Sequence, residues 1–269
     1  MKFYAHPSKL KNGMVLSNSI PAKADSILAQ LSAQNIEARL IGALSVRMHA
    51  HNGPNLDRPV SDIDFVAHSE DRKKVTKILE GMGYEAAVMF NSVNPNRLLF
   101  VDKTDGTRVD VFLDVFDMCH HLNFRRRLNI AKPLQTLPVA DLLATKLQIV
   151  QINEKDLKDI ITLMRCHELA QDDSEPERIN IRYLSELCKD DWGIYKTFTT
   201  TIERASDYAS KSNLDEAERA VVLVKLKRTR EEMEQIPKSF KWKMRARIGE
   251  KQQWYNLPET RIVEPGKPT

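Results

Sequence analysis

The stretch of sequence that decides the fold runs over residues 61–66 and reads Ser61-Asp62-Ile63-Asp64-Phe65-Val66. Its β-branched and aromatic residues favour a β-strand, in which side chains two positions apart lie on the same face. Asp62 and Asp64 are therefore predicted to lie side by side. Neighbouring carboxylates repel each other unless water, a raised pKa or a cation relieves the repulsion. A solvated strand face satisfies this pattern, and so does a Mg²⁺ site, since Mg²⁺ is often held by carboxylates and substrate phosphates.

A junction between a strand and a helix precedes the paired carboxylates. Residues 37–41 favour a short strand, and Gly42 is followed by a hydrophobic pattern with helical spacing. Glycine lets the backbone approach a ligand closely, and a helix N-terminus presents N–H groups suited to phosphate. An ordinary structural turn would have the same sequence, so this junction does not by itself establish a site.

A hairpin is predicted after the paired carboxylates. Expected here are a helix over residues 70–82 and strands over residues 84–90, 97–102 and 107–115, with a turn at Asp105-Gly106. In the last strand, Asp110 alternates with hydrophobic neighbours and can join Asp62 and Asp64 in a cluster of three carboxylates. Pairing with Arg108 on the same face is the alternative. Asp114 shares that face but lies about 13 Å further along the strand, so only one of the two acids can join the pair.

The chain changes from mixed α and β structure to helices near Pro133 and Pro138. We expect a first helix from Pro21 to about Asn35, and every later periodic segment after residue 138 favours a helix. The predicted organisation is an N-terminal arm over residues 1–20, an α+β domain over 21–132, a helical domain over 133–257 and a mobile tail over 258–269.

Charged residues on the first two helices of this second half are further candidates. Lys146 shares a hydrophobic stripe with Leu142 and Val150, so its ammonium group either extends to solvent or reaches an anion across a cleft. Lys155 and Asp159 lie four positions apart on the next helix. Without other context, their face is predicted to be solvated.

The composition is that of a globular protein with an uneven charge distribution. The net charge is +4, but residues 219–251 alone carry eleven Lys and Arg against four Glu. Aromatic residues near 240–242 lie among these basic residues, a combination that suits a nucleic-acid backbone as well as a solvated helix face. No hydrophobic run is long enough for a membrane span, and we expect a cytoplasmic protein. The odd number of three cysteines favours reduced, structural thiols.

Taken together, three elements resemble the polymerase-β-like nucleotidyltransferase superfamily. They are Ile41-Gly42-Ala43-Leu44-Ser45, Ser61-Asp62-Ile63-Asp64-Phe65 and Val109-Asp110-Val111. A narrower resemblance, over about residues 36–165, is to AbiEii-type abortive-infection toxin nucleotidyltransferases. It rests on Arg58 four positions before Asp62, on the lysine-containing helix around Lys146, and on Lys155-Asp156-Leu157-Lys158-Asp159. One departure is Ala43, where the superfamily usually has Gly or Ser.

The resemblance implies a nucleotidyltransferase fold in the α+β domain, closed by the helical domain. It implies that Asp62, Asp64 and Asp110 hold two Mg²⁺ ions about 3.5 to 4 Å apart, with a nucleoside triphosphate as substrate. Catalytic residues would be these three acids and Lys146. Nucleotide contacts would come from Gly42, Ser45, Arg58, Lys146, Lys155 and Asp159.

Three functions remain open from the sequence. The acceptor of the nucleotide can be an RNA or tRNA 3′ end, bound through the basic C-terminal helices as in a toxin with a cognate antitoxin protein. It can also be the hydroxyl of a small molecule, as in antibiotic-modifying relatives. The third function is a catalytically weak module that binds a nucleotide or a partner protein, which the departure at Ala43 motivates.

Overall fold

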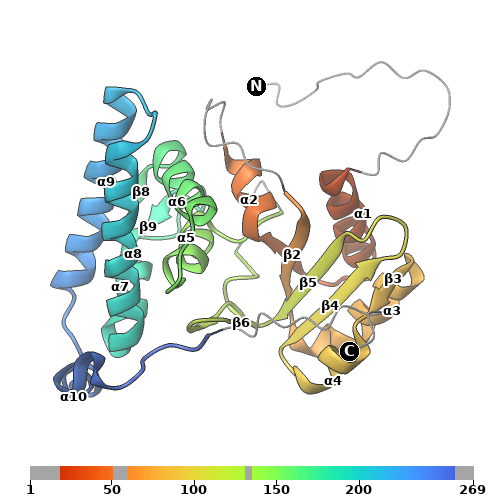
Figure 1. Cartoon of the computed structure of the whole chain (residues 1–269). Coiled ribbons are helices and arrows are strands. Elements are labelled where there is room, and N and C mark those ends of the chain that lie inside the picture. Colours follow the sequence, from red (N-terminus) through yellow and green to blue (C-terminus); the bar gives the residue numbers. More distant parts are fainter. Residues whose placement is uncertain (1–18, 51–59, 131–134, 258–269) are drawn as a thin grey trace, which may run out of the picture.

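The computed structural model describes residues 19–50, 60–130 and 135–257. A mixed sheet with its covering helices forms one side of the molecule, and a group of helices forms the other (Figure 1). Within the described residues, no helix combines the length and hydrophobicity needed to cross a membrane.

The sheet contains five strands in the order β1-β2-β5-β4-β3. The strands are β1 (Ala38–Ile41), β2 (Asp62–Ala67), β3 (Tyr84–Ala86), β4 (Arg97–Asp102) and β5 (Arg108–Leu113). The central pair β2 and β5 is parallel, whereas β1 with β2, β4 with β5 and β3 with β4 are antiparallel. Gly106, at φ +77°, turns the chain between β4 and β5 as the Asp-Gly pair predicts.

One face of the sheet is covered by helices α1 (Ile20–Ala33) and α3 (Arg72–Gly81), the latter preceded by the 3₁₀ turn η1 (Ser69–Asp71). Ile63, Val109 and Val111 point into this core, where they are fully buried with Leu31 of α1 and Leu79 of α3. Alternation along β2 and β5 therefore places their polar residues on the opposite face. The predicted helix after Pro21 and the predicted alternation are both confirmed.

The predicted strand over residues 84–90 is wrong in its second half. The strand ends at Ala86, and residues Val88–Val93 form the short helix α4. Asn91 gives the physical reason, because its side-chain oxygen accepts a hydrogen bond from the Leu99 backbone N–H at 2.7 Å and its amide donates to the Leu99 carbonyl at 3.2 Å. This side chain takes the place of a strand neighbour at the edge of β4.

The second half of the chain is helical, as predicted, apart from a small strand pair. The strands β6 (Val115–Asp117) and β7 (His121–Asn123) precede it, and its own elements are α5 (Val139–Leu147), α6 (Glu154–Cys166), β8 (Leu169–Ala170), β9 (Ile179–Asn180), α7 (Ile181–Asp190), α8 (Trp192–Lys211), α9 (Glu216–Gln235), α10 (Phe240–Ile248) and the 3₁₀ turn η2 (Gly249–Lys251). The two-residue strands β8 and β9 pair in parallel within a region predicted to be all helix. They are too short to give a hydrophobic pattern.

A second hydrophobic core joins the sheet to these helices. Val66 and Phe112 lie on the face of the sheet opposite α1 and α3, and they belong to the same buried cluster as Leu143 of α5 and Ile161 of α6. Helix α5 therefore covers part of the face of the sheet that carries the polar residues. The predicted arm, apart from residues 19 and 20, and the predicted tail lie outside the described residues, and the division at residue 132 stays a prediction.

Candidate active site

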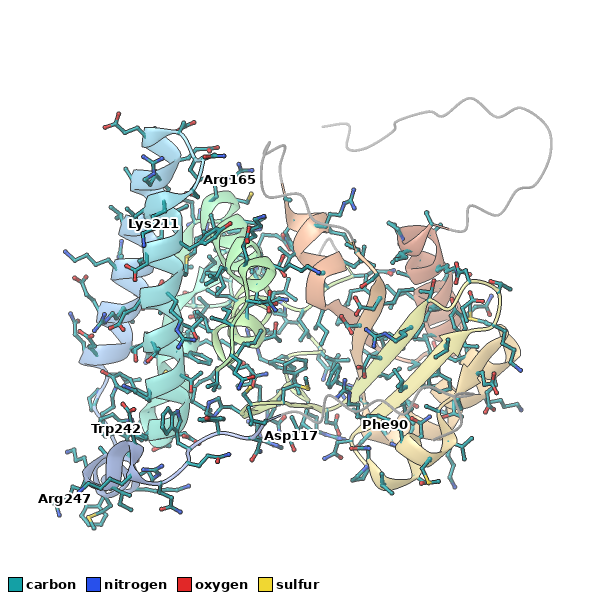
Figure 2. The ribbon with its side chains drawn as sticks, in the orientation of Figure 1. Phe90, Asp117, Arg165, Lys211, Trp242 and Arg247 are labelled. Carbon is teal, nitrogen blue, oxygen red and sulfur yellow. The ribbon has the colours of Figure 1, made fainter. Side chains whose placement is uncertain are left out.

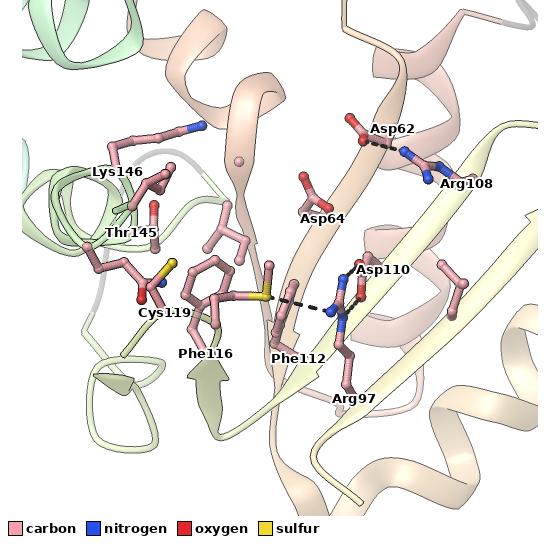
Figure 3. A pocket seen from close by; sticks show the side chains of 16 residues that line it. Asp62, Asp64, Arg97, Arg108, Asp110, Phe112, Phe116, Cys119, Thr145 and Lys146 are labelled. Carbon is pink, nitrogen blue, oxygen red and sulfur yellow. Dashed lines mark hydrogen bonds and ion pairs between the residues drawn. The ribbon is translucent and has the colours of Figure 1, made fainter. Parts of the chain in front are cut away.

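The paired carboxylates and Asp110 come together on the face of the sheet that points toward α5. In the parallel pairing of β2 with β5, Asp64 lies directly opposite Asp110, and Asp62 lies opposite Arg108. Asp62, Asp64 and Asp110 all line one cavity (Figure 3). The sheet register therefore brings together the three acids named from the sequence.

Gly42 lies beside the Asp64 carboxylate of this cluster. Ile41 is the β1 partner of Asp64, so the chain turns into helix α2 (Gly42–His49) immediately beside that carboxylate. Gly42 has φ +70°, and a Cβ atom at this position would lie 2.2 Å from Asp64 Oδ2. Both the backbone conformation and the contact exclude a side chain.

The carboxylates perturb one another. Burial and the negative charges of Asp110 and Asp62 raise the pKa of Asp64 from 3.8 to about 8, although Lys146 and Arg97 act in the opposite direction. At neutral pH the fold therefore favours a proton on Asp64 in the absence of a metal ion. A divalent cation bound by the three carboxylates would remove the same repulsion.

Arg97 of β4 is a site residue that the sequence reasoning missed. Its Nε donates to Asp110 Oδ1 at 2.8 Å and a terminal nitrogen donates to Asp110 Oδ2, so both oxygens of Asp110 are engaged. The guanidinium lies against the rings of Phe90 and Phe112, with its Cζ 5.4 and 4.9 Å from their centroids. The pairing of Asp110 with Arg108, the alternative considered from the sequence, is not the one observed, since Arg108 contacts Asp62 at 3.4 Å.

Lys146 lines the cavity from α5 and projects toward the strand that carries the paired acids (Figure 3). Its ammonium nitrogen lies 2.9 Å from Asp156 and 2.8 Å from Asp159, both on α6. Burial alone would lower the pKa of Lys146, but Asp159 and Asp156 outweigh burial and raise it above its ordinary value. Lys146 is thus a buried, charged group in contact with carboxylates, and of the two alternatives considered from the sequence, extension to solvent is not observed.

The remaining candidates are placed less directly. Ser45 is fully buried, and its hydroxyl donates to the Gly42 carbonyl at 3.0 Å instead of pointing into the cavity. Lys155 is exposed on α6 and does not line the cavity, whereas Asp159 is buried beside Lys146, so the face predicted to be solvated is only partly so. Arg58 lies outside the described residues. A phosphate contact from Ser45, Arg58 or Lys155 stays a prediction.

Asp114, the second candidate on β5, lies away from the cluster. It follows the end of β5 with φ +60°, and its carboxylate lies 3.1 Å from His68 Nδ1 and 2.6 Å from a terminal nitrogen of Arg125. Burial would raise the pKa of Asp114, but hydrogen bonds from Ser69, His68 and Arg125 hold it below the ordinary value. Asp114 therefore forms an ion pair with Arg125, and Asp110 is the acid that lies with Asp62 and Asp64.

The cavity has a volume of about 340 Å³, within the range of small-molecule sites. One end is acidic and the other is hydrophobic, with Phe112, Phe116, Met118 and Ile149 in its wall. Among the described lining residues, the cations Arg97, Arg108 and Lys146 each contact a carboxylate. Asp62, Asp64 and Asp110 supply carboxylate oxygens from one face of the sheet, so the donor set fits a divalent cation.

Comparison of the sequence with protein-family models and with curated proteins finds no match. Comparison of the fold with solved structures finds similarity to the lincosamide antibiotic adenylyltransferase LnuA with lincomycin bound. The TM-score is 0.41 and the identity 17%, over 52% of this chain and 94% of that one. The antibiotic-resistance factor ANT(2'')-Ia is similar with a TM-score of 0.40 and 12% identity, over 63% of this chain and 95% of that one.

Proposed function

We propose that this protein is a Mg²⁺-dependent nucleotidyltransferase that transfers a nucleoside monophosphate from a triphosphate to a hydroxyl group. The observation that carries the proposal is the register of Asp64 against Asp110, with Asp62 on the same face and Gly42 turning into α2 beside Asp64. The three acids provide oxygen ligands for hard cations, and the N-terminus of α2, whose first residue lies beside Asp64, provides N–H donors for phosphates.

In this proposal the acidic residues would bind the metal ions and the basic residue Lys146 would bind the phosphates. Asp62, Asp64 and Asp110 would hold the metal ions, which neutralise phosphate charge and lower the pKa of the attacking hydroxyl when bound. Gly42 allows the first turn of α2 to lie beside Asp64, a contact that a side chain would prevent, and the N–H groups of that turn would bind the triphosphate. Lys146 would act on the phosphates as a point charge. Positioning and charge stabilisation are the main contributions of a protein to phosphoryl transfer.

For the acceptor, we propose a small molecule in preference to RNA. The hydrophobic wall formed by Phe112, Phe116 and Met118 adjoins the acidic cluster and suits a compact ligand. The basic helix α10 packs against α7 and α8, and Arg247 lies on the helical side of the molecule, whereas Phe90 of α4 lies on the side of the sheet (Figure 2). Helix α10, one part of the basic segment expected to bind RNA, is thus on the other side of the molecule from the sheet that carries the acids. The narrower AbiEii-type assignment, with its antitoxin partner, stays a prediction from the sequence alone.

Labelled nucleoside triphosphates test the reaction. The protein is incubated with each α-³²P-labelled triphosphate and Mg²⁺, together with either a panel of aminoglycosides and lincosamides or total tRNA. Transfer moves the α-label to the acceptor and releases pyrophosphate, so γ-labelled triphosphate must leave the acceptor unlabelled. An RNA acceptor would also bind with an affinity that falls steeply with salt, because phosphate contacts release counterions. A lincosamide, which carries at most one positive charge, would show little salt dependence.

Two carboxylate variants from the same region provide matched controls. Asp64→Asn is expected to abolish transfer, whereas Asp114→Asn, which lies off the cavity and pairs with Arg125, is expected to retain it. Absence of transfer with both acceptor pools, although the triphosphate with Mg²⁺ still raises the melting temperature, would support the binding module instead. Transfer that survives in Asp64→Asn would contradict the assigned metal ligands.

A further inference from the structure

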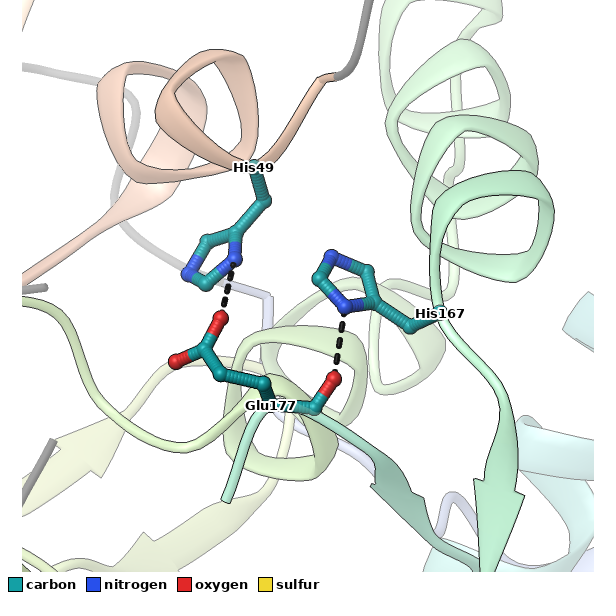
Figure 4. A group of neighbouring side chains, drawn as sticks. All are labelled: His49, His167 and Glu177. Carbon is teal, nitrogen blue, oxygen red and sulfur yellow. Dashed lines mark hydrogen bonds and ion pairs between the residues drawn. The ribbon is translucent and has the colours of Figure 1, made fainter. Parts of the chain in front are cut away.

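His49, His167 and Glu177 form a second group of ligand-type side chains, separate from the acidic cluster (Figure 4). Each residue offers one ligand atom, and these three atoms lie within 4.8 Å of one another. His49 and His167 are 1% and 5% exposed, whereas the Glu177 side chain is about one-third exposed, at 36%. The two imidazoles are therefore interior, and the Glu177 side chain is partly exposed although its Oε1 atom is buried.

The fold assembles this group from three distant segments. His49 is the last residue of α2, and His167 is the residue at which α6 ends. The β8–β9 pair then returns the chain to the same place, because the Ile179 N–H donates to the Glu168 carbonyl at 2.8 Å. Glu177 thus lies beside His167, although ten positions separate them.

Hydrogen bonds fix the protonation pattern of both imidazoles. The Thr136 hydroxyl donates to the Leu137 carbonyl at 3.0 Å, and a hydroxyl that donates there accepts from His49 Nε2, which lies 2.9 Å away. The Glu177 carbonyl, likewise an acceptor only, lies 2.6 Å from His167 Nδ1. In the neutral rings, the basic nitrogens are therefore Nδ1 of His49 and Nε2 of His167.

The basic nitrogen of His49 lies next to a carboxylate oxygen of Glu177, which is also a hydrogen-bond acceptor. His49 Nδ1 lies 3.2 Å from Glu177 Oε2, and a neutral imidazole nitrogen and a carboxylate oxygen in contact require a proton or a metal ion between them. Two imidazoles and one carboxylate are a common donor set for Zn²⁺, and ligand histidines usually donate their other N–H to an oxygen of the protein. Tetrahedral Zn²⁺ ligands are about 3.3 Å apart, which the His49–Glu177 contact already matches.

We propose that His49, His167 and Glu177 bind one divalent transition-metal ion, with Zn²⁺ as the fitting ion and water in the fourth position. Such an ion would tie the C-terminal end of α2 to α6 and to the loop before β9. Helix α2 has eight residues, so about 12 Å separates its two ends, and the ion would brace the helix whose other end adjoins Asp64. The proposal does not depend on the proposed nucleotidyltransferase activity.

Cobalt provides a direct test, since Co²⁺ absorbs visible light strongly in a tetrahedral site and weakly in an octahedral oxygen site. Full-length protein is freed of metal with a chelator and titrated with Co²⁺ and then with Zn²⁺. The expected result is a strong absorption band that saturates at one equivalent and is displaced by Zn²⁺, with a rise in melting temperature. A weak octahedral spectrum alone, or no binding, would overturn the proposal and leave a protonated His49–Glu177 ion pair.

Two variants remove a ligand atom but preserve the supporting hydrogen bond. His49→Gln retains a donor for Thr136, and His167→Asn retains a donor for the Glu177 carbonyl. Both should fold, as circular dichroism will check, and both should lose the strong band. Thr136→Val is expected to weaken Zn²⁺ binding about 10- to 100-fold.

His120→Gln is the matched control, because His120 is a buried histidine that also bonds a threonine hydroxyl, at 2.8 Å from Thr197, but lies outside the group. It should keep the band at one equivalent. A strong band that persists in either ligand variant, or that disappears in His120→Gln, would contradict the assignment.

Discussion

Asp64 should make the stability of the metal-free protein fall as the pH rises. Its pKa is raised to about 8 in the folded protein, against 3.8 for an ordinary aspartate. The folded state therefore holds a proton that the unfolded state releases, and stability decreases with pH between about 4 and 8. Asp64→Asn removes the titrating group, so the variant should lack this part of the pH dependence.

The size of the effect follows from the pKa shift. From pH 6 to pH 8, a carboxyl with a folded pKa of about 8 accounts for a loss of about 2 kcal/mol in the free energy of unfolding. Because Asp64 stays partly open to the cavity, solvent screening lowers the expected loss to about 1 to 2 kcal/mol. For a chain of this size, that loss corresponds to a melting temperature about 2 to 8 °C lower at pH 8 than at pH 6.

Scanning calorimetry in the presence of a chelator at pH 6, 7 and 8 measures this loss as the difference between wild type and Asp64→Asn. Subtraction cancels the histidines that titrate in both proteins. Asp114→Asn is the control, because the pKa of Asp114 is held below its ordinary value and its loss should lower the melting temperature equally at each pH. Equal pH dependence in wild type and Asp64→Asn would refute the reasoning. Added Mg²⁺ should stabilise wild type more at pH 8 than at pH 6, since a proton competes for Asp64 at the lower pH.

Three further substitutions probe the neighbours of Asp64. Gly42→Ala would force an alanine to adopt φ +70° and would place its Cβ 2.2 Å from the Asp64 carboxylate. The substitution should lower the stability measured by calorimetry by about 1 to 3 kcal/mol and abolish nucleotide transfer. Arg97→Met leaves Asp110 without its ion-pair partner, so we expect about 3 kcal/mol of destabilisation without metal, and a larger Mg²⁺-dependent rise in melting temperature than in wild type. Lys146→Met removes the ammonium group that contacts Asp156 and the buried Asp159 of α6 and should cost about 3 to 5 kcal/mol of stability. Lys146→Arg should restore the stability, whereas its KM for the triphosphate should stay above that of wild type.

The central cluster could be predicted because its geometry depends on local rules. A period of two places Asp62 and Asp64 on one face, and alternation in residues 107–115 places Asp110 on the corresponding face of its own strand. Gly42 carries the signal of a turn that tolerates no side chain. What the sequence left open was which of Asp110 and Asp114 meets the pair, because that choice depends on the register between two strands distant in the sequence.

Arg97 carried a signal that the sequence reasoning did not use. Once the Asp105-Gly106 turn pairs Val101 with Arg108, counting along the hairpin places Leu99 opposite Asp110 and Arg97 opposite Phe112. Arg97 then lies diagonal to Asp110 on the same face, within reach of a long side chain. The link of Lys146 to Asp159 had no such local signal, because it depends on how α5 packs against α6.

The ion pairs of the cavity neutralise the acids while the site is empty and leave cations available for a triphosphate when metal binds. Arg97 engages both oxygens of Asp110, and Arg108 contacts Asp62, so each guanidinium neutralises a carboxylate that the proposed function assigns to metal binding. When these carboxylates turn to a divalent cation, Arg97 and Arg108 lose their partners in the same cavity where phosphate oxygens arrive. Metal and triphosphate should therefore bind with positive coupling, and by thermodynamic linkage each should raise the affinity of the other by the same factor.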